Sequence, residues 1–131
     1  MANKFNFDKV ISDFRKVKAR MMKDISQETL KHFDKSFPNE GFTDSALSKW
    51  KLRKFDYPWN ILEKTGKMRR GTKISYISLA KCVIVNDVPY AKYHNFGTTR
   101  LPVRQFVNRS LNLDNKCVDI IEKNMINIFK I

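Results

Sequence analysis

Few residues in this chain could do chemistry, and their spacing matches no common catalytic or metal site. The 131 residues include two histidines, His32 and His94, and two cysteines, Cys82 and Cys117. Zinc sites use histidines and cysteines in short repeated spacings, and none occurs here. The 13 carboxylates are scattered singly, which leaves no obvious general acid and base. A Cys82–His94 nucleophile pair stays open, but neither residue lies in a recognisable motif. We therefore expect a non-catalytic protein without metal or cofactor.

Aromatic side chains gather in one short stretch between residues 86 and 106. Tyr90, Tyr93 and His94 have the spacing that places side chains on one face of a helix, and Phe96 follows closely. Clustered aromatic residues most often pack into a core, because each ring buries a large apolar area. We expect Tyr90, Tyr93 and Phe96 to form an aromatic plug that closes one end of a β-sheet.

The residues after these aromatic side chains predict a change of chain direction. Gly97 would end the helical turn with a positive φ, which glycine adopts without strain. An exposed loop over residues 98–101 comes next, and we expect a hydrogen bond from His94 to order it. Pro102 then resets the direction of the chain, and Phe106 anchors it in the core.

The two helices that should position these residues are clear from the spacing of apolar side chains. Apolar residues recur every three or four positions over residues 7–36, which predicts a long amphipathic helix with Asn6 as its N-cap. Phe37-Pro38 ends this pattern. A C-terminal helix is predicted after Asp114, which would cap it. Its apolar stripe comprises Val118, Ile121, Met125, Ile128 and Phe129.

Between the helices, the sequence predicts a stretch rich in loops. We expect a short helix over residues 45–53 with Asp44 as its cap, and a helical turn over residues 59–64. Trp50 and Trp59 would pin this stretch onto the body of the protein.

A β-hairpin is predicted next, at residues 73–79 and 82–85, with a turn at residues 80–81. Residues 103–107 could form a third strand or lead into the final helix. A hairpin alone is marginally stable, so the long helix should pack across it. The predicted fold class is α+β, with a long N-terminal amphipathic helix and a C-terminal helix packed on a small antiparallel β-sheet, in one domain of residues 1–131.

Positive charge is the strongest feature of the composition. The net charge is +13, which favours DNA, RNA or an acidic protein face as a partner. Much of it lies in residues 47–73, where Asp56 and Glu63 are the only acidic residues. The basic residues of this segment are Lys49, Lys51, Arg53, Lys54, Lys64, Lys67, Arg69, Arg70 and Lys73.

This basic segment predicts a surface for a polyanion, either channel DNA or an acidic ring of protein. We expect Lys67, Arg69 and Arg70 to lie on one face with Lys51 and Arg53. A surface that serves only solubility usually mixes both signs of charge. The alternative interpretation is a mobile solvated loop.

Two parts of the sequence, taken in order, resemble a family of bacteriophage proteins. Tyr-Ala-x-Tyr-His-x-Phe-Gly followed by Pro-x-Arg-x-Phe is similar to the virion-morphogenesis or tail-completion (head–tail joining) proteins. The residues that carry this likeness are Tyr90, Ala91, Tyr93, His94, Phe96, Gly97, Pro102, Arg104 and Phe106. Upstream, the family has a loop tryptophan, an apolar pair and a Thr-Gly-x-Leu-Arg element. The matching residues are Trp50, Ile61, Leu62, Thr65, Gly66, Lys67, Met68 and Arg69, with Met68 in place of leucine.

The resemblance covers residues 50–107 and implies a structural component of the virion. Such proteins finish the end of the tail or form the ring between the tail and the head connector. The likeness implies closed rings in some members, often of six subunits, with other tail or connector proteins as partners. Whether the isolated chain is a monomer until it docks stays open. The basic charge is compatible with a ring around channel DNA or beside an acidic ring, assembled in the host cytoplasm. Gln105 departs from the family, where a proline is common at its place.

Two other function classes stay open at the level of sequence. A small basic nucleic-acid-binding protein outside the virion would explain the charge and the interspersed aromatic residues. However, no helix-turn-helix, zinc finger or RNP-like stretch appears. A small hydrolase or toxin is the least supported. No membrane span is expected, because the sequence lacks a run of about 20 apolar residues. The long basic amphipathic helix could lie on a membrane surface, but its regular apolar face is expected to pack against the rest of the chain, which needs a core partner. Residues 1–20 alternate charged and apolar side chains, unlike a signal peptide.

Overall fold

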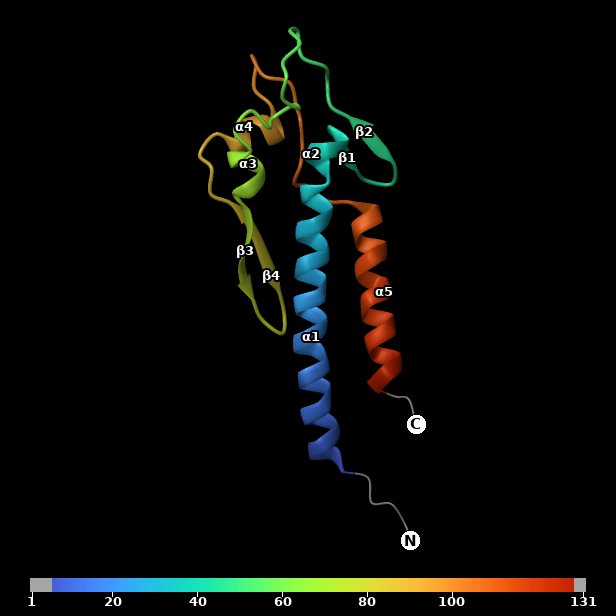
Figure 1. The fold of residues 1–131 in the computed structure, drawn as a ribbon. Coiled ribbons are helices and arrows are strands. Elements are labelled where there is room, and N and C mark those ends of the chain that lie inside the picture. Colours follow the sequence, from blue (N-terminus) through green and yellow to red (C-terminus); the bar gives the residue numbers. More distant parts are fainter. Residues whose placement is uncertain (1–5, 129–131) are drawn as a thin grey trace.

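The computed structural model describes residues 6–128 as a long, narrow molecule built around one helix (Figure 1). The helices are α1 (Phe7–Asp34), α2 (Ser36–Asn39), α3 (Lys67–Arg70), α4 (Ala91–Phe96) and α5 (Leu111–Ile128). The strands are β1 (Gly41–Thr43), β2 (Leu47–Lys49), β3 (Thr72–Ile77) and β4 (Cys82–Asn86). The α+β fold class predicted from the sequence is confirmed.

Helix α1 begins and ends close to the predicted bounds. The Asn6 side chain caps it by accepting a hydrogen bond from the backbone N–H of Lys9 at 3.1 Å, as the sequence indicated. Asp8 lies in the first turn, where its negative charge interacts favourably with the positive end of the helix dipole. After α1 the short helix α2 continues the direction of the chain and ends at Glu40, which has a left-handed conformation with φ 48°.

Helix α1 separates the other two long elements of the fold. The hairpin β3–β4 contacts it on one side and α5 packs along it on the other (Figure 1). Lys116 on α5 forms an ion pair with Glu28 on α1 at 3.7 Å. The start of α1 extends beyond the other elements, and Ile11 is 51% exposed there. We call this the helix end, and the opposite end, with α2, α3 and α4, the pocket end.

The hairpin β3–β4 forms close to the predicted residues, with its turn before Cys82 as expected. The strands are antiparallel, with Thr72 opposite Asn86 and Ile77 opposite Cys82. The backbone N–H of Ser78 donates to the carbonyl of Lys81 at 2.8 Å and closes the turn. This sheet contains two strands in the part of the chain that the structure describes, so both of its outer edges are unpaired there.

The short helix predicted in the loop-rich stretch is wrong. Part of the predicted helix over residues 45–53 forms β2, which pairs with β1. Trp50 explains the difference, because its backbone N–H donates to the carbonyl of Glu40 at 2.7 Å and its indole N–H to the carbonyl of Gln105 at 2.8 Å. These contacts require an extended chain. Residues 59–64 form only a turn.

Helix α5 begins one turn earlier than Asp114, which lies in its first turn instead of capping it. The hydroxyl of Ser110 accepts from the N–H of Leu113 at 3.1 Å, and Asp44 accepts from the N–H of Leu111 at 2.7 Å. Asp44 was expected to cap a helix of its own. It fixes the start of α5 from a distant part of the sequence.

The buried side of α5 also differs from the predicted apolar stripe. Leu113 is buried and Cys117 packs beside it, whereas Val118 and Ile121 are 48% and 39% exposed. The inward face is therefore rotated by about one residue from the prediction. Within the predicted stripe, Phe129 and the side chain of Ile128 lie outside the residues that the structure describes.

The main core lies at the pocket end and joins segments that are distant in sequence. Phe37 is fully buried, with its ring centroid 5.3 Å from that of Phe106 and 5.8 Å from that of Trp50. The other buried members are Ile61, Met68, Val88 and Ala91. A second cluster beside α1 comprises Phe33, Phe42 and Leu113. Trp50 and Phe106 therefore have the anchoring role predicted for them.

Residues 103–107 form neither a strand nor a helix, because the side chain of Asn95 holds them instead. Its Oδ1 accepts from the N–H groups of Phe106 and Val107 at 2.8 and 3.0 Å, and its Nδ2 donates to the carbonyl of Val107 at 2.9 Å. Asn95 is 6% exposed, so water does not replace these bonds.

Replacing Asn95 with alanine should therefore lower the free energy of unfolding by about 3 kcal/mol, because it leaves buried backbone groups unpaired. Urea denaturation followed by circular dichroism measures this loss. Asn108→Ala is the matched control, since Asn108 is exposed and should change stability by less than about 0.5 kcal/mol. Equal effects of the two variants would contradict the role of Asn95.

His32 predicts a pH dependence of stability. It is 5% exposed, its Nε2–H donates to the carbonyl of Thr43 at 3.0 Å, and burial holds its pKa below the ordinary value. The unfolded chain therefore binds the proton more readily than the folded chain. The free energy of unfolding should fall as the pH drops below about 6.5. Burial lowers the pKa of His94 in the same direction.

The pH effect can be assigned with His32→Gln, which removes the titrating group and keeps an N–H donor. The slope of unfolding free energy between about pH 7 and 5.5 should become smaller in this variant. Replacing both histidines should reduce it further. An unchanged slope in the double variant would show that other groups cause it.

Candidate functional site

The segments that resemble the phage family meet at the pocket end. The indole of Trp50 and the carbonyl of Gln105 join two of them, and the N–H of Arg104 donates to the carbonyl of His94 at 2.8 Å. Ala91 and Phe106 lie in the shared core, and Pro102 is half-buried. These segments therefore form one structural unit, although up to about fifty residues separate them in the sequence.

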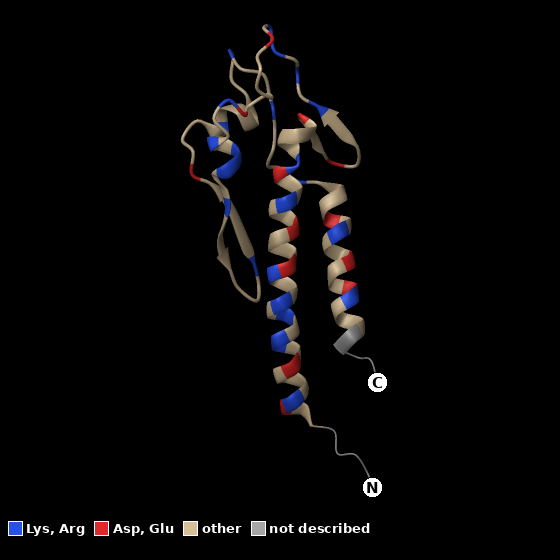
Figure 2. Cartoon of the chain, viewed as in Figure 1, with Lys and Arg blue, Asp and Glu red and all other residues tan. Residues whose placement is uncertain are grey.

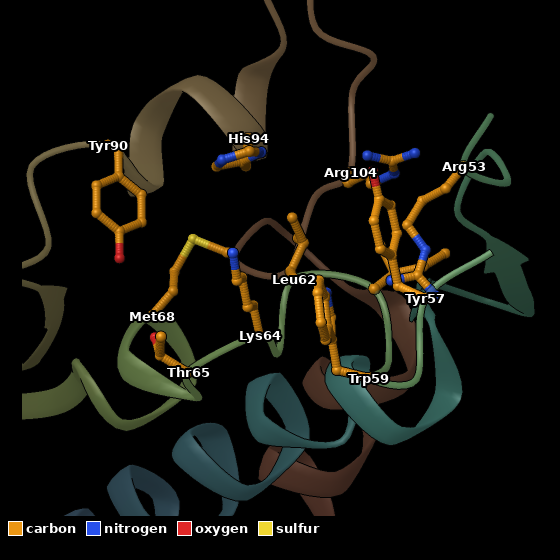
Figure 3. A pocket seen from close by; sticks show the side chains of 11 residues that line it. Arg53, Tyr57, Trp59, Leu62, Lys64, Thr65, Met68, Tyr90, His94 and Arg104 are labelled. Carbon is orange, nitrogen blue, oxygen red and sulfur yellow. The ribbon is translucent and has the colours of Figure 1, made fainter. Parts of the chain in front are cut away.

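A cavity of about 250 Å³ opens between these segments (Figure 3). We call it the cationic pocket. Its apolar residues Ile61 and Met68 are buried, whereas charged and aromatic side chains complete the wall. The lining residues are Arg53, Tyr57, Trp59, Ile61, Leu62, Lys64, Thr65, Met68, Tyr90, His94 and Arg104.

Four side chains of the loop before α3 form a layered stack at this pocket. The rings of Tyr57 and Trp59 are 4.9 Å apart and inclined by only 16°. The guanidinium of Arg53 lies 5.4 Å from the centre of the Tyr57 ring, and the ammonium of Lys64 lies 5.2 Å from a ring of Trp59. Figure 3 shows the order Lys64, Trp59, Tyr57, Arg53. These cation–π contacts order a segment without regular secondary structure.

Arg104 enters the pocket from the opposite segment. Its Nε and Nη2 groups donate to the carbonyl of Lys51 at 3.1 and 2.8 Å. Burial lowers the pKa of Arg104, and the positive charge of Arg53 lowers it further. Arg104 therefore contacts a backbone carbonyl and forms no ion pair with a carboxylate among residues 6–128.

His94 and Tyr90 close another side of the pocket. Their rings meet edge to face at 6.2 Å and 88°. Burial, and then the charge of Arg104, lower the pKa of His94, so the imidazole is neutral at neutral pH. The expected hydrogen bond from His94 to the loop over residues 98–101 is absent. Thr98 orders this loop, because its Oγ1 accepts from the N–H groups of Arg100 and Leu101.

The predicted aromatic plug is wrong. Tyr90, Tyr93 and Phe96 are 43%, 47% and 71% exposed, whereas α4 buries Ala91 and Asn95. Ala91 and Asn95 are four residues apart and therefore lie on the same face of α4. Because the methyl group of Ala91 and the amide of Asn95 are small, this face can lie close to the core. The aromatic rings consequently point outward, where Tyr90 faces the pocket.

Two glycines of the family motif have the special backbone angles that explain their presence. Gly97 has φ 75° and ψ 168°, so the predicted positive φ is confirmed. A Cβ atom there would lie only 2.8 Å from the side chain of Val103. Gly66 has φ 68° and precedes α3, where the hydroxyl of Thr65 accepts from the N–H of Lys67 at 3.3 Å.

Arg69 is neutralised inside the fold and does not offer its charge to a partner. It donates from Nε and Nη2 to the carboxylate of Asp34 at 2.8 and 2.9 Å, and from Nη1 to Glu63 at 2.7 Å. The hydrogen bond from Arg69 holds the pKa of Asp34 below its ordinary value. Reversing the charge of Arg69 would therefore disrupt the attachment of α3 to α1.

The rest of the predicted polyanion face is also divided. Lys73 pairs with Asp87 at 2.9 Å, and Lys49 donates to the carbonyl of Asn39 at 2.7 Å. Six exposed cations of the basic segment form no ion pair with a carboxylate in residues 6–128: Lys49, Lys51, Lys54, Lys64, Lys67 and Arg70. Figure 2 shows both signs of charge along α1 and α5. In the cationic pocket, Arg53, Lys64 and Arg104 form no ion pair with a carboxylate of residues 6–128.

Tyr57 was not singled out from the sequence, and Leu62 and Lys64 were not placed in a pocket. Their signal in the sequence is a group of aromatic residues, Phe55, Tyr57 and Trp59, with cations on both sides of it. Such a group is compatible with a stack, but only the fold shows that Arg104 lies beside it.

The described part of the chain contains no group of three His, Cys, Asp or Glu residues able to hold a metal ion. Cys82 and Cys117 are both free thiols. No helix within residues 6–128 has the length and apolar character needed to cross a bilayer. Protein-family models, curated protein sequences and solved structures yield no match to this chain.

Arg69→Gln should lower the free energy of unfolding by about 1.5 kcal/mol, because it breaks charged hydrogen bonds to Asp34 and Glu63. The contribution of Asp34 is present above its ordinary pKa and is lost as acid titrates the folded protein. The variant should therefore differ least from the parent at low pH. Arg70→Gln is the control, since Arg70 is exposed and has no carboxylate partner among the described residues. Equal stability of the two variants would contradict this role.

Proposed function

We propose that this chain is a structural protein of a bacteriophage particle, which completes the tail or joins the tail to the head connector. The observation that supports this most is the convergence of the family-like segments at the pocket end. Trp50, Asn95 and Arg104 bond those segments to one another, so the likeness extends over one folded unit. The unit surrounds a pocket suited to binding.

Exposed apolar residues at the other end support a role in joining. Ile11 and Phe14 on α1 are 51% and 37% exposed, and Ile126 on α5 is 64% exposed. Tyr76 and Ile77, near the tip of the hairpin, are 52% and 40% exposed. Exposed apolar surface of this kind is typical of interfaces. A joint must contact different neighbours, and this molecule has distinct surfaces at its two ends.

The hairpin suggests how copies of the chain could associate. Its unpaired outer edges can accept a strand from another molecule. Repeated head-to-tail contacts of one kind close into a ring when the rotation between subunits allows it. We propose a homo-oligomeric ring in the particle, with the isolated chain staying monomeric until it docks on a template.

The proposal is tested with a phage that carries a stop codon early in this gene. Without the protein, negative-stain electron microscopy should show filled heads and separate tails, and a plasmid copy of the gene should restore complete particles. Mass spectrometry of purified wild-type particles should detect the chain. A normal yield of infectious particles from the stop-codon phage would refute the proposed function.

A small nucleic-acid-binding protein outside the virion is a second candidate. The net charge of +13 and the aromatic residues beside Arg53 and Lys64 favour it. It predicts strong binding of single-stranded oligonucleotides, with affinity that falls steeply with salt. It also predicts that the protein is absent from purified particles, which distinguishes it from the first proposal.

A further inference from the structure

We propose that the cationic pocket binds an acidic peptide segment of a neighbouring protein, in which a carboxylate adjoins an apolar side chain. This inference rests on the proposed function, because it names the chemistry of a neighbour that the joint would contact. Charge, free hydrogen-bond donors, the apolar floor and the covered aromatic rings each support it.

The charge of the pocket favours an anion, because Arg53 and Arg104 are half-buried and Lys64 lies beside them. Arg53, Lys64 and Arg104 line it, and none of them forms an ion pair with any residue between 6 and 128. The protein neutralises Arg69 and Lys73 with its own carboxylates, so acidic residues are placed beside cations elsewhere. Partly buried like charges without a counter-charge are unfavourable. A bound anion would remove this repulsion.

The donors of the pocket suit an oxyanion. Arg104 uses Nε and Nη2 on the carbonyl of Lys51, which leaves Nη1 without a hydrogen bond to any described residue. The Arg53 guanidinium contacts the Tyr57 ring and likewise makes no hydrogen bond within residues 6–128. Guanidinium groups bind the two oxygens of a carboxylate, or those of a phosphate, through parallel N–H bonds.

The floor of the pocket distinguishes between these two anions. Ile61, Leu62 and Met68 line it, so the ligand must place an apolar group next to its charge. The cavity of about 250 Å³ is smaller than the roughly 300–1,000 Å³ of most small-molecule sites. It therefore has room for one or two side chains of a peptide. The sugars beside a backbone phosphate are polar and do not match this floor.

The aromatic stack also disfavours nucleobases. Nucleic-acid sites of this type need a free ring face on which a base can stack. The 4.9 Å spacing of Tyr57 and Trp59 leaves no room for a guanidinium between them, so Arg53 and Lys64 cover the outer faces. A base could stack on either ring only by displacing the cation from it. Of the two macromolecules, the geometry favours an acidic peptide.

Fluorescence anisotropy with labelled synthetic peptides tests this inference. The probe is a peptide of alternating glutamate and leucine. The comparison peptide alternates glutamate and glycine, has the same length and charge, and lacks the apolar groups. The glutamate–leucine peptide should bind about tenfold more tightly, because only it fills the apolar floor. Equal affinities of the two peptides would overturn the proposal.

Variants assign the binding to the pocket. Arg53→Gln and Lys64→Gln should each weaken binding of the glutamate–leucine peptide by about tenfold. The matched control is Lys54→Gln, which removes the same charge at an exposed residue outside this pocket and should leave affinity nearly unchanged. Circular dichroism and urea denaturation check that each variant is folded. An equal loss in the control would show general attraction to a basic protein.

Oligonucleotides provide the competing outcome. A single-stranded and a double-stranded DNA of matched charge should not displace the peptide at equal concentration. Displacement that disappears in Arg53→Gln would overturn the peptide assignment in favour of nucleic acid.

The phage experiment stays separate from these results. Peptide binding together with normal particles from the stop-codon phage would refute only the proposed function. Dependence of the particles on the gene, without selective peptide binding, would refute only this inference.

Discussion

The hydrogen bonds of the Asn95 amide are the interaction on which the pocket end depends. This end contains short helices and irregular chain, so few backbone groups there can pair within a helix or sheet. One buried side chain satisfies three of them and thereby fixes the position of Phe106 under Phe37. Because Arg104 is two residues before Phe106, the position of Phe106 also determines where Arg104 lies. The pocket is thus a consequence of core packing and one polar clamp.

The cations of the chain have two different physical roles. Arg69 lies between Asp34 and Glu63 and attaches α3 to α1, so its charge serves the fold. Arg53 and Lys64 instead cover aromatic rings and keep their charge available at a cavity. A count of lysines and arginines cannot separate these roles, because both kinds occur in the same segment. Their distance from carboxylates in space separates them.

The division of the molecule into two ends is consistent with a part that connects neighbours. The helix end exposes apolar side chains on α1 and α5, and the pocket end carries uncompensated positive charge. Association through the first would be driven by burial of apolar area, whereas binding at the second would depend on charge and on an apolar floor. The pocket end also exposes apolar side chains, among them Phe96 at 71%, so the cationic pocket is what distinguishes it from the helix end.

The sequence by itself determined the elements whose signal is local. The long helix, its Asn6 cap, the hairpin, the positive φ of Gly97 and the anchoring by Trp50 and Phe106 all follow from periodicity or backbone preference, and the structure agrees. Only the tertiary structure decided the start of α5, because Ser110 and the distant Asp44 cap it. It also decided which face of α4 is buried, where packing selected Ala91 and Asn95 over the larger rings. The tertiary structure likewise decided the pocket. Its charge depends on contacts between residues about fifty positions apart, and the spacing of residues along the chain does not indicate such contacts.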